Sequence, residues 1–169
     1  MKTLYLLRHA KSSWADVSLA DFDRPLNDRG LDAAPFMGRF IAENNFIPDT
    51  ILTSPARRAE QTARLVKEAA AIPHSIKFDE RIYEASPQML SQVVSELDDG
   101  LTSAMLIGHN PGIEGFIRFL TGTLEPMPTA ALAVIDLSIQ KWDEISANKG
   151  AVEHIARPKE LLKARHDPR

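Results

Sequence analysis

The stretch LYLLRHA at residues 4–10 places an arginine and a histidine directly after an apolar run. The continuous apolar segment Thr3–Leu7 is typical of a strand in a parallel sheet that is covered on both faces. In α/β folds of this kind, ligands bind beyond the carboxyl ends of the strands. We therefore expect Arg8 and His9 to lie at the mouth of a sheet, where a ligand would bind.

These two side chains suit a phosphorylated ligand. A neutral imidazole can attack phosphorus, and an adjacent guanidinium can bind phosphate oxygens through paired hydrogen bonds. Two later segments add to the pair: SPARRAEQT at 54–62 contains further arginines, and GHNP at 108–111 contains a second histidine. The three segments together predict a site for a phosphoryl group.

The composition sets broad limits. The 169 residues fit one domain, spanning 1–169, which is large enough to bury a core without disulfides. The charged fraction of 25% and hydrophobic fraction of 44% are typical of a soluble globular protein. A net charge of −3 argues against a nucleic-acid binder, and the lack of cysteine excludes disulfides, thiolate metal sites and cysteine nucleophiles. With no apolar run of membrane-spanning length and no signal peptide, we expect a cytoplasmic monomer without membrane partners.

Strand-like and helix-like segments alternate along the chain, which predicts an α/β domain. The first helix is expected near Asp28 with Asn27 as its cap, and Pro35 within it predicts a kink or a later start. A polar segment, Gln140–Gly150, predicts a hairpin connection between the last two strands. The expected strands are Thr3–Leu7, Thr50–Thr53, Ser75–Phe78, Ala104–Ile107, Ala130–Leu137 and Ala151–Ala156.

Three junctions pair a favoured N-cap residue with proline at the first helical position: Ser54-Pro55, Ser86-Pro87 and Asn110-Pro111. The first and third directly follow strands. They therefore predict free backbone N–H groups and the positive ends of helix dipoles at the ligand-binding edge of the sheet. We interpret Ser86-Pro87 as an ordinary helix start.

Arg58 falls in the first turn of a helix, where a cation is mildly unfavourable unless an anion compensates it. Its neighbour Arg57 faces another direction, so the two cannot point at one ligand. His9 and His109 each follow an apolar strand, at equivalent ends of the sheet. We therefore expect the two histidines to lie together at one end of the sheet, whereas Arg58, on these residues alone, is either a solvated surface group or is compensated by an anion.

Four ordered motifs resemble those of the histidine phosphatase (phosphoglycerate mutase-like) superfamily, and within it the small SixA-like phosphohistidine phosphatases. They are LLRHAKSSW at 6–14, DFDRPLNDRG at 21–30, SPxxRAxQT at 54–62 and GHNPG at 108–112. The resemblance implies a three-layer α/β/α sandwich with a mostly parallel central sheet of about six strands. It also implies that His9 becomes phosphorylated. The residues around the phosphate would be Arg8, Arg58 and His109, and no metal or cofactor would take part.

Further candidates lie near these residues. Ser12 lies in the loop after His9, and Asn110 follows the second histidine, so both are candidate substrate-binding residues. In the superfamily a carboxylate usually protonates the leaving group, and Glu84 is our candidate for this general acid. The alternative is that Glu84 is a solvated loop residue.

Glu80 and Asp23 are lesser candidates for the general acid, and we interpret the pair Asp21-x-Asp23 as serving loop structure. Ala10 stands where the superfamily more often has glycine, as the SixA-like branch often shows. The chain lacks the long insertions of mutases and larger acid phosphatases, so the resemblance implies an open cleft that suits a protein side chain. Trp14 could pack against an apolar part of a substrate, although tryptophan more often anchors a loop to the core.

These observations predict a metal-independent phosphatase that acts through phosphorylated His9, with phosphohistidine on a protein as its substrate. One alternative is a phosphatase of small phosphate esters, such as a sugar phosphate or a nucleotide. A second alternative is a phosphate-binding module without turnover.

Overall fold

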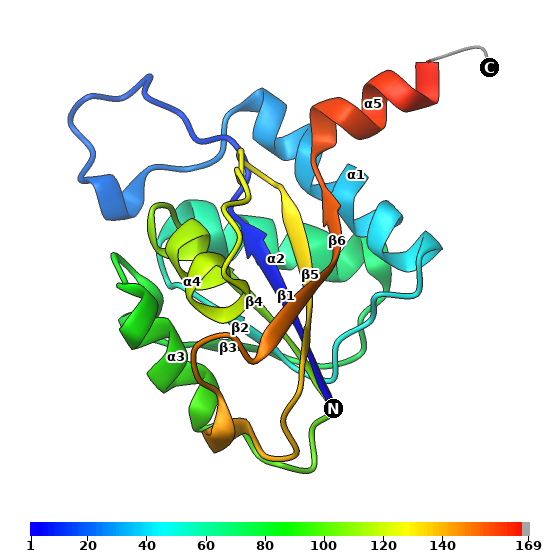
Figure 1. Cartoon of the computed structure of the whole chain (residues 1–169). Helices are drawn as coiled ribbons and strands as arrows, with labels where there is room; N and C mark the ends of the chain where they lie inside the picture. Colours follow the sequence, from blue (N-terminus) through cyan, green and yellow to red (C-terminus); the bar gives the residue numbers. More distant parts are fainter. Residues whose placement is uncertain (167–169) are drawn as a thin grey trace.

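The structure is a computed structural model that describes residues 1–166. Its six strands form one sheet in the order β3-β2-β4-β1-β5-β6 (Figure 1). Four strands are parallel: β1 (Lys2–Arg8), β2 (Ile51–Thr53), β3 (Ile76–Phe78) and β4 (Ser103–Gly108). The other two form antiparallel pairs at one edge: β5 (Leu132–Leu137) is antiparallel to β1, and β6 (Gly150–Ala156) is antiparallel to β5. The mostly parallel sheet is therefore confirmed, with an antiparallel pair added beside β1.

The α-helices within residues 1–166 cover both faces of this sheet (Figure 1). α1 (Asp28–Glu43) and α2 (Arg57–Ala70) pack together on one face, where α5 (Pro158–His166) contacts α1. α3 (Pro87–Ser95) and α4 (Gly112–Thr121) pack together on the other face. The expected three-layer arrangement is confirmed.

The central strand β1 shows why the sequence gives three layers. Leu4 and Leu6 lie in one hydrophobic core with Phe116 of α4, whereas Tyr5 and Leu7 lie in a second core with helices α1 and α2. Successive side chains of a strand point to opposite faces. A continuous apolar run is therefore what a strand between two helical layers requires.

Two predicted helix starts are confirmed. α1 begins at Asp28 with the side chain of Asn27 as its cap, and α3 begins directly after Ser86, whose side chain caps it. Pro35 lies inside α1, so the alternative of a later start is wrong.

The other two predicted starts are wrong. α2 begins at Arg57, so Ser54-Pro55 precedes its cap position, and α4 begins at Gly112, with Pro111 before it. Before α2, the Ser54 hydroxyl bonds to the ring of His109 at 2.8 Å. Before α4, the amide of Asn110 donates to Glu114 and to the carbonyl of Met127. The helices therefore begin one or two residues later than a capping serine or asparagine would require.

Parallel pairing brings the ends of three strands to one edge of the sheet. At this edge Arg8 of β1 pairs with Gly108 of β4, and Thr53 of β2 pairs with Ile107. The residues that follow these strand ends directly are His9, Ser54 and His109. The register of the sheet therefore places both histidines at the same edge.

No helix within residues 1–166 has the length and apolar composition needed to cross a membrane.

Candidate functional site

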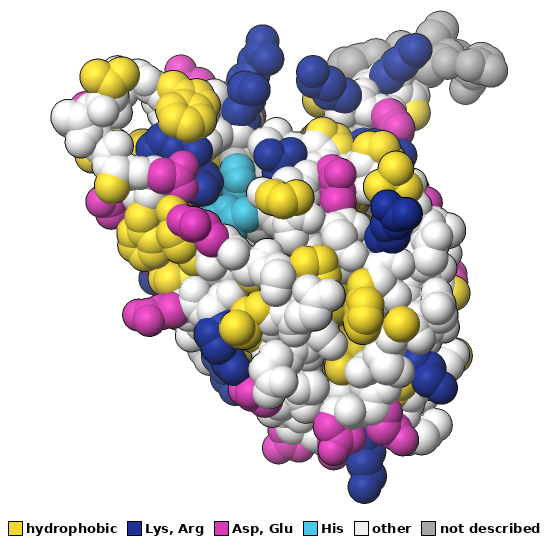
Figure 2. All heavy atoms as spheres, turned by 60° about the vertical axis from the view of Figure 1, so that its left-hand side comes forward, with side chains coloured by type: hydrophobic (Ala, Val, Ile, Leu, Met, Phe, Trp, Pro, Cys, Tyr) yellow, Lys and Arg dark blue, Asp and Glu magenta, His cyan; other side chains and the backbone are white. Residues whose placement is uncertain are grey.

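A cleft of about 310 Å³ opens at this edge of the sheet. Figure 2 shows histidine side chains in a hollow, with basic side chains around them and hydrophobic side chains on the adjoining rim. Every residue expected to surround the phosphate lines the cleft, and so do both candidate substrate-binding residues. The lining residues are Arg8, His9, Lys11, Ser12, Trp14, Arg24, Arg58, His109, Asn110 and Thr129.

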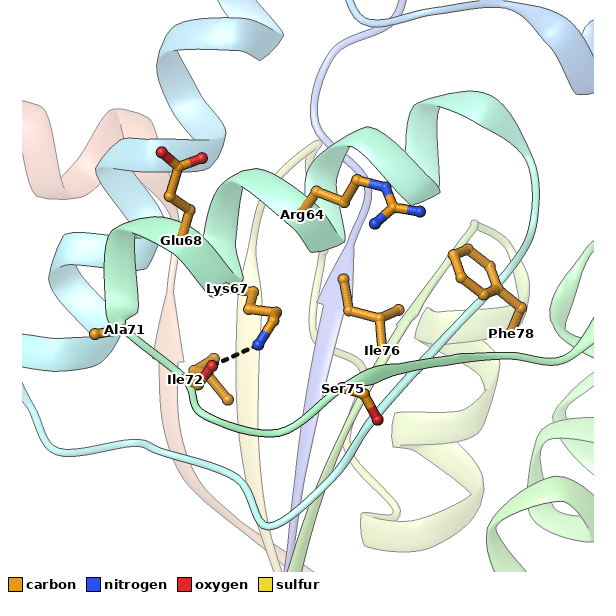
Figure 3. Close-up of a pocket in the computed structure, with 8 residues that line it drawn as sticks. All are labelled: Arg64, Lys67, Glu68, Ala71, Ile72, Ser75, Ile76 and Phe78. Atoms are coloured by element: carbon orange, nitrogen blue, oxygen red, sulfur yellow. Dashed lines mark hydrogen bonds between the residues drawn. The ribbon is translucent and has the colours of Figure 1, made fainter.

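A larger hollow of about 800 Å³ lies between α2 and the edge strand β3 (Figure 3). Arg64, Ile76 and Phe78 border it, and the ammonium of Lys67 donates to the carbonyl of Ile72 at 2.7 Å. The described residues that line this hollow include no histidine and none of the residues expected to surround the phosphate. The smaller cleft is therefore the candidate site.

His9 is buried, with 6% of its surface exposed, at the inner end of the cleft. Its Nδ1 lies 2.7 Å from the carbonyl oxygen of Ala10. A carbonyl only accepts hydrogen bonds, so we assign the proton to Nδ1, which leaves the lone pair of Nε2 free. Burial, reinforced by the nearby His109 and arginine side chains, lowers the pKa of His9 to about 3. The imidazole is therefore neutral near pH 7, the state that a nucleophile needs.

The ring of His109 lies beside His9, with 5.1 Å between the ring centroids. Its Nε2 is 2.8 Å from the Ser54 hydroxyl, and that hydroxyl already accepts the N–H of Ala56 at 3.2 Å. The hydroxyl can donate its proton to Nε2, and on that choice of tautomer the ring proton of His109 is on Nδ1. Burial, followed by the positive charge of Arg58, lowers the pKa of His109 to about 4.

Arg58 enters the cleft from the first turn of α2 and is only 6% exposed, whereas Arg57 is exposed. Its Nη1 donates to the backbone carbonyl of Asp21 at 2.7 Å, and its Nη2 donates to the Asp21 carboxylate at 3.0 Å. Two of the five N–H donors of the guanidinium are therefore engaged by Asp21. Its Nε is buried and has no partner within residues 1–166.

Asp21 lies in the short 3₁₀ helix Asp21–Asp23 and holds several side chains together. Besides Arg58, it accepts from Arg24 at 3.0 and 3.1 Å and from the Tyr83 hydroxyl at 2.7 Å. Desolvation raises the pKa of Asp21, but the hydrogen bonds from Tyr83, Arg24 and Arg58 outweigh it and hold the pKa at about 2. The interpretation of Asp21 as a loop residue alone missed this role. The signal available in the sequence was the i, i+3 spacing of Asp21 and Arg24 within one motif.

Arg8 is the remaining residue expected to surround the phosphate, and it lines the same cleft. Its Nη1 donates to the carbonyl of Met127 at 3.0 Å, and burial is the main cause that lowers its pKa. Within residues 1–166, the buried side-chain nitrogens without a hydrogen-bond partner are Arg8 Nε, Arg58 Nε and His109 Nδ1. An unsatisfied buried donor costs about 1–3 kcal/mol. All three nitrogens belong to side chains that line the cleft, so an anion bound there would lie next to them.

The two candidate substrate-binding residues, Ser12 and Asn110, both make hydrogen bonds within the protein. The Ser12 hydroxyl accepts from Arg24 Nη1 at 2.8 Å. The amide of Asn110 donates to Glu114 at 2.6 Å and to the Met127 carbonyl at 3.0 Å, and its oxygen accepts from the Glu114 N–H. Asn110 therefore lines the cleft with its polar atoms already engaged.

The carboxylates expected to donate a proton lie outside the cleft. Glu84 is exposed, has a φ of 55° and is not among the lining residues. Glu80 and Asp23 are also exposed. Their placement leaves the identity of the general acid a prediction.

The expectation that Trp14 anchors its loop to the core is wrong. Its side chain is 72% exposed and lines the mouth of the cleft. The guanidinium carbon of Arg24 lies 3.5 Å from the centroid of the indole ring. Trp14 packs on a buried arginine.

Among residues 1–166, no group of three or more His, Cys, Asp or Glu side chains is arranged to hold a metal ion.

A sequence profile of the histidine phosphatase superfamily (branch 1) matches residues 4–99. An uncharacterized protein of Mycobacterium tuberculosis is 31% identical over 157 residues, which are 86% of this chain and 96% of the relative. A 2,3-bisphosphoglycerate-dependent phosphoglycerate mutase of Mycobacterium leprae is 38% identical over 90 residues, which are 49% of this chain and 36% of the mutase.

Solved structures show the same fold. A candidate phosphohistidine phosphatase, SixA of Agrobacterium tumefaciens, is 30% identical, with a TM-score of 0.79 over 93% of this chain and 98% of that one. A protein histidine phosphatase SixA in complex with tungstate is 22% identical, with a TM-score of 0.82 over 94% of this chain and 99% of that one.

Proposed function

The chain belongs to the histidine phosphatase superfamily, in its SixA-like branch, and on this basis we propose that it hydrolyses phosphohistidine on a protein through a phosphoenzyme at His9. One observation carries the proposal. A neutral imidazole with a free Nε2 lies among three buried N–H donors that have no partner within residues 1–166. A phosphoryl group bound there would meet the nucleophile and the donors together.

In the first step, the lone pair of His9 Nε2 attacks phosphorus. The bond between phosphorus and the substrate nitrogen breaks, and its electron pair stays on the departing imidazole, which takes up a proton. Negative charge on the oxygens of the phosphoryl group is stabilised by Arg8, Arg58 and His109. Catalysis of this transfer consists mainly of positioning and electrostatic stabilisation.

In the second step, water attacks the phosphorus of the phosphoenzyme. The P–N bond to His9 breaks, its electron pair returns to Nε2, and the water gives up a proton as inorganic phosphate forms. We propose Glu84 as the group that exchanges protons with the leaving group and the water. It adjoins Tyr83, which binds Asp21 of the site. An imidazole leaving group needs little acid assistance, so an exposed carboxylate is sufficient.

The small size and open mouth of the cleft favour a phosphorylated side chain over a large free ligand. Its volume of about 310 Å³ is at the lower end of the range for ligand sites. A phosphoryl group and one small ring would fill it, with the remainder of a protein substrate outside.

The test is a comparison of kcat/KM for a phosphohistidine protein, a sugar phosphate and a nucleotide. We expect the phosphohistidine protein to lead by a wide margin, and His9→Ala to abolish turnover of all three. A lead for either small ester would select that substrate class instead. Binding of phosphate without any turnover would contradict the enzymatic proposal.

A further inference from the structure

Trp14 is the most exposed aromatic side chain within residues 1–166, and it lies at the mouth of the cleft that contains His9. One face of its indole is covered by the guanidinium of Arg24, 3.5 Å from the ring centroid. The side chain remains 72% exposed, so the rest of the ring is open to solvent. A large apolar ring at a binding site is a contact surface that a ligand can use.

The ring is held in a defined place. The wide loop between β1 and α1, at the upper left of Figure 1, is closed at its base by a bridge between Ser12 and Leu26. The Ser13 N–H also donates to the carbonyl of Pro25 at 2.8 Å. Trp14 follows this closed base by a single residue, so its backbone is tied to the rim of the cleft.

Arg24 fixes the side chain of Trp14 from beneath. Its guanidinium donates to Ser12 at 2.8 Å and twice to the carboxylate of Asp21. The same carboxylate binds Arg58 at 3.0 Å. The indole is therefore connected, through Arg24 and Asp21, to the arginine that would bind the phosphoryl group.

The in-line geometry of phosphoryl transfer places the leaving group on the side of the cleft where Trp14 lies. In phosphoryl transfer the attacking and leaving atoms lie roughly in line on opposite sides of phosphorus. His9 is buried at the inner end of the cleft, so a group opposite its Nε2 must lie at the mouth. Trp14 lines that mouth.

We propose that Trp14 is a specificity-determining residue whose indole contacts a planar leaving group, an aromatic or imidazole ring bonded to the phosphoryl group. The inference rests on the proposed function and sharpens it, because it selects planar over aliphatic leaving groups. Stacking between such rings corresponds to about a threefold to tenfold gain.

A turnover experiment compares leaving groups that differ in planarity. The substrates are phosphoimidazole and phosphoramidate, which both have a P–N bond, and phenyl phosphate and glycerol phosphate, which are both esters. We expect Trp14→Leu to lower kcat/KM about threefold to tenfold for the two planar substrates and to leave the other two unchanged. Trp14→Phe should restore most of the loss. Val17→Ser, a change in the same loop at a side chain that is 95% exposed, is the control.

A binding experiment separates this inference from the proposed function, because it needs no turnover. Phenylphosphonate and methylphosphonate are stable probes that differ only in the planar group. The chain has two tryptophans, and the second, Trp142, is fully buried, so quenching of exposed indole fluorescence reports Trp14. We expect tighter binding of phenylphosphonate to the unaltered protein. In Trp14→Leu, which lacks this fluorophore, both affinities are measured by titration calorimetry, and we expect the preference to be lost.

Equal losses on the two planar substrates and on phosphoramidate and glycerol phosphate, or equal binding of the two phosphonates to the unaltered protein, would overturn the role of Trp14. Absence of turnover on every substrate, with the phosphonate preference intact, would overturn the phosphatase proposal and leave the aromatic subsite in place.

Discussion

Replacing Asp21 with asparagine tests whether a residue without a chemical role orients the site. The substitution keeps the shape of the side chain and the backbone carbonyl that binds Arg58 Nη1. It removes the negative charge that binds Arg58, Arg24 and Tyr83. Because the pKa of Asp21 is about 2, this charge is present throughout the working pH range.

The size of the effect follows from these contacts. Hydrogen bonds to charged groups contribute about 1.5–3 kcal/mol each, but the Asp21 side chain is 48% exposed, so solvent screens them. We expect Asp21→Asn to lower the free energy of unfolding by about 1–2 kcal/mol in total. Displacing Arg58 by a fraction of an ångström should lower kcat by about tenfold to a hundredfold.

The assay measures kcat and KM alongside urea unfolding, with Asp16→Asn as the matched control, since Asp16 is exposed and lies in the same loop between β1 and α1. We expect kcat to fall more than KM rises, and the ratio of kcat between the two variants to be constant between about pH 5 and pH 8. Wild-type kcat in Asp21→Asn, or an equal loss in Asp16→Asn, would refute the role of Asp21.

Three further outcomes are expected. Arg58→Ala should lower kcat about a hundredfold to a thousandfold, whereas Arg57→Ala, at an exposed neighbour, should retain the activity in the same assay. The pKa values of His9 and His109 lie well below the ordinary 6.5, so the unfolded chain binds protons first as the pH falls. The free energy of unfolding should therefore be highest above about pH 6.5 and fall by about 2 kcal/mol per imidazole by about pH 5 in urea titrations; a flat profile would contradict the burial of neutral rings. Inorganic phosphate at about 100 times its Kd should raise the free energy of unfolding by about 2.7 kcal/mol in thermal melts, and Arg58→Ala should weaken this binding.

The meeting of the two histidines could be predicted because it depends on regular structure. Each histidine follows an apolar strand, and parallel strands present the same ends at one edge, so the register of β1 with β4 was enough to bring them together. Helical geometry also predicted that Arg57 and Arg58 face different ways, and the resemblance to the family motif selected Arg58 as the inward one.

The network around Asp21 could not be predicted because it depends on how an irregular loop folds back. Asp21, Arg24 and Trp14 come from the segment between β1 and α1, and Tyr83 comes from the connection before α3. No periodic pattern orients such side chains. The helix starts at Ser54 and Asn110 failed for a related reason. The Ser54 hydroxyl bonds to His109, and the Asn110 amide bonds to Glu114 and Met127, while its oxygen accepts an N–H of α4 from one residue before the cap position.

The most direct test of the account is to map the phosphoryl group on the protein during turnover, by rapid quench and peptide analysis. We predict an acid-labile, base-stable phosphoryl group on Nε2 of His9 alone. It should be absent from His9→Ala and should form in step with release of the leaving group. A phosphoryl group on any other residue, or turnover with no phosphoenzyme at the earliest times, would contradict it.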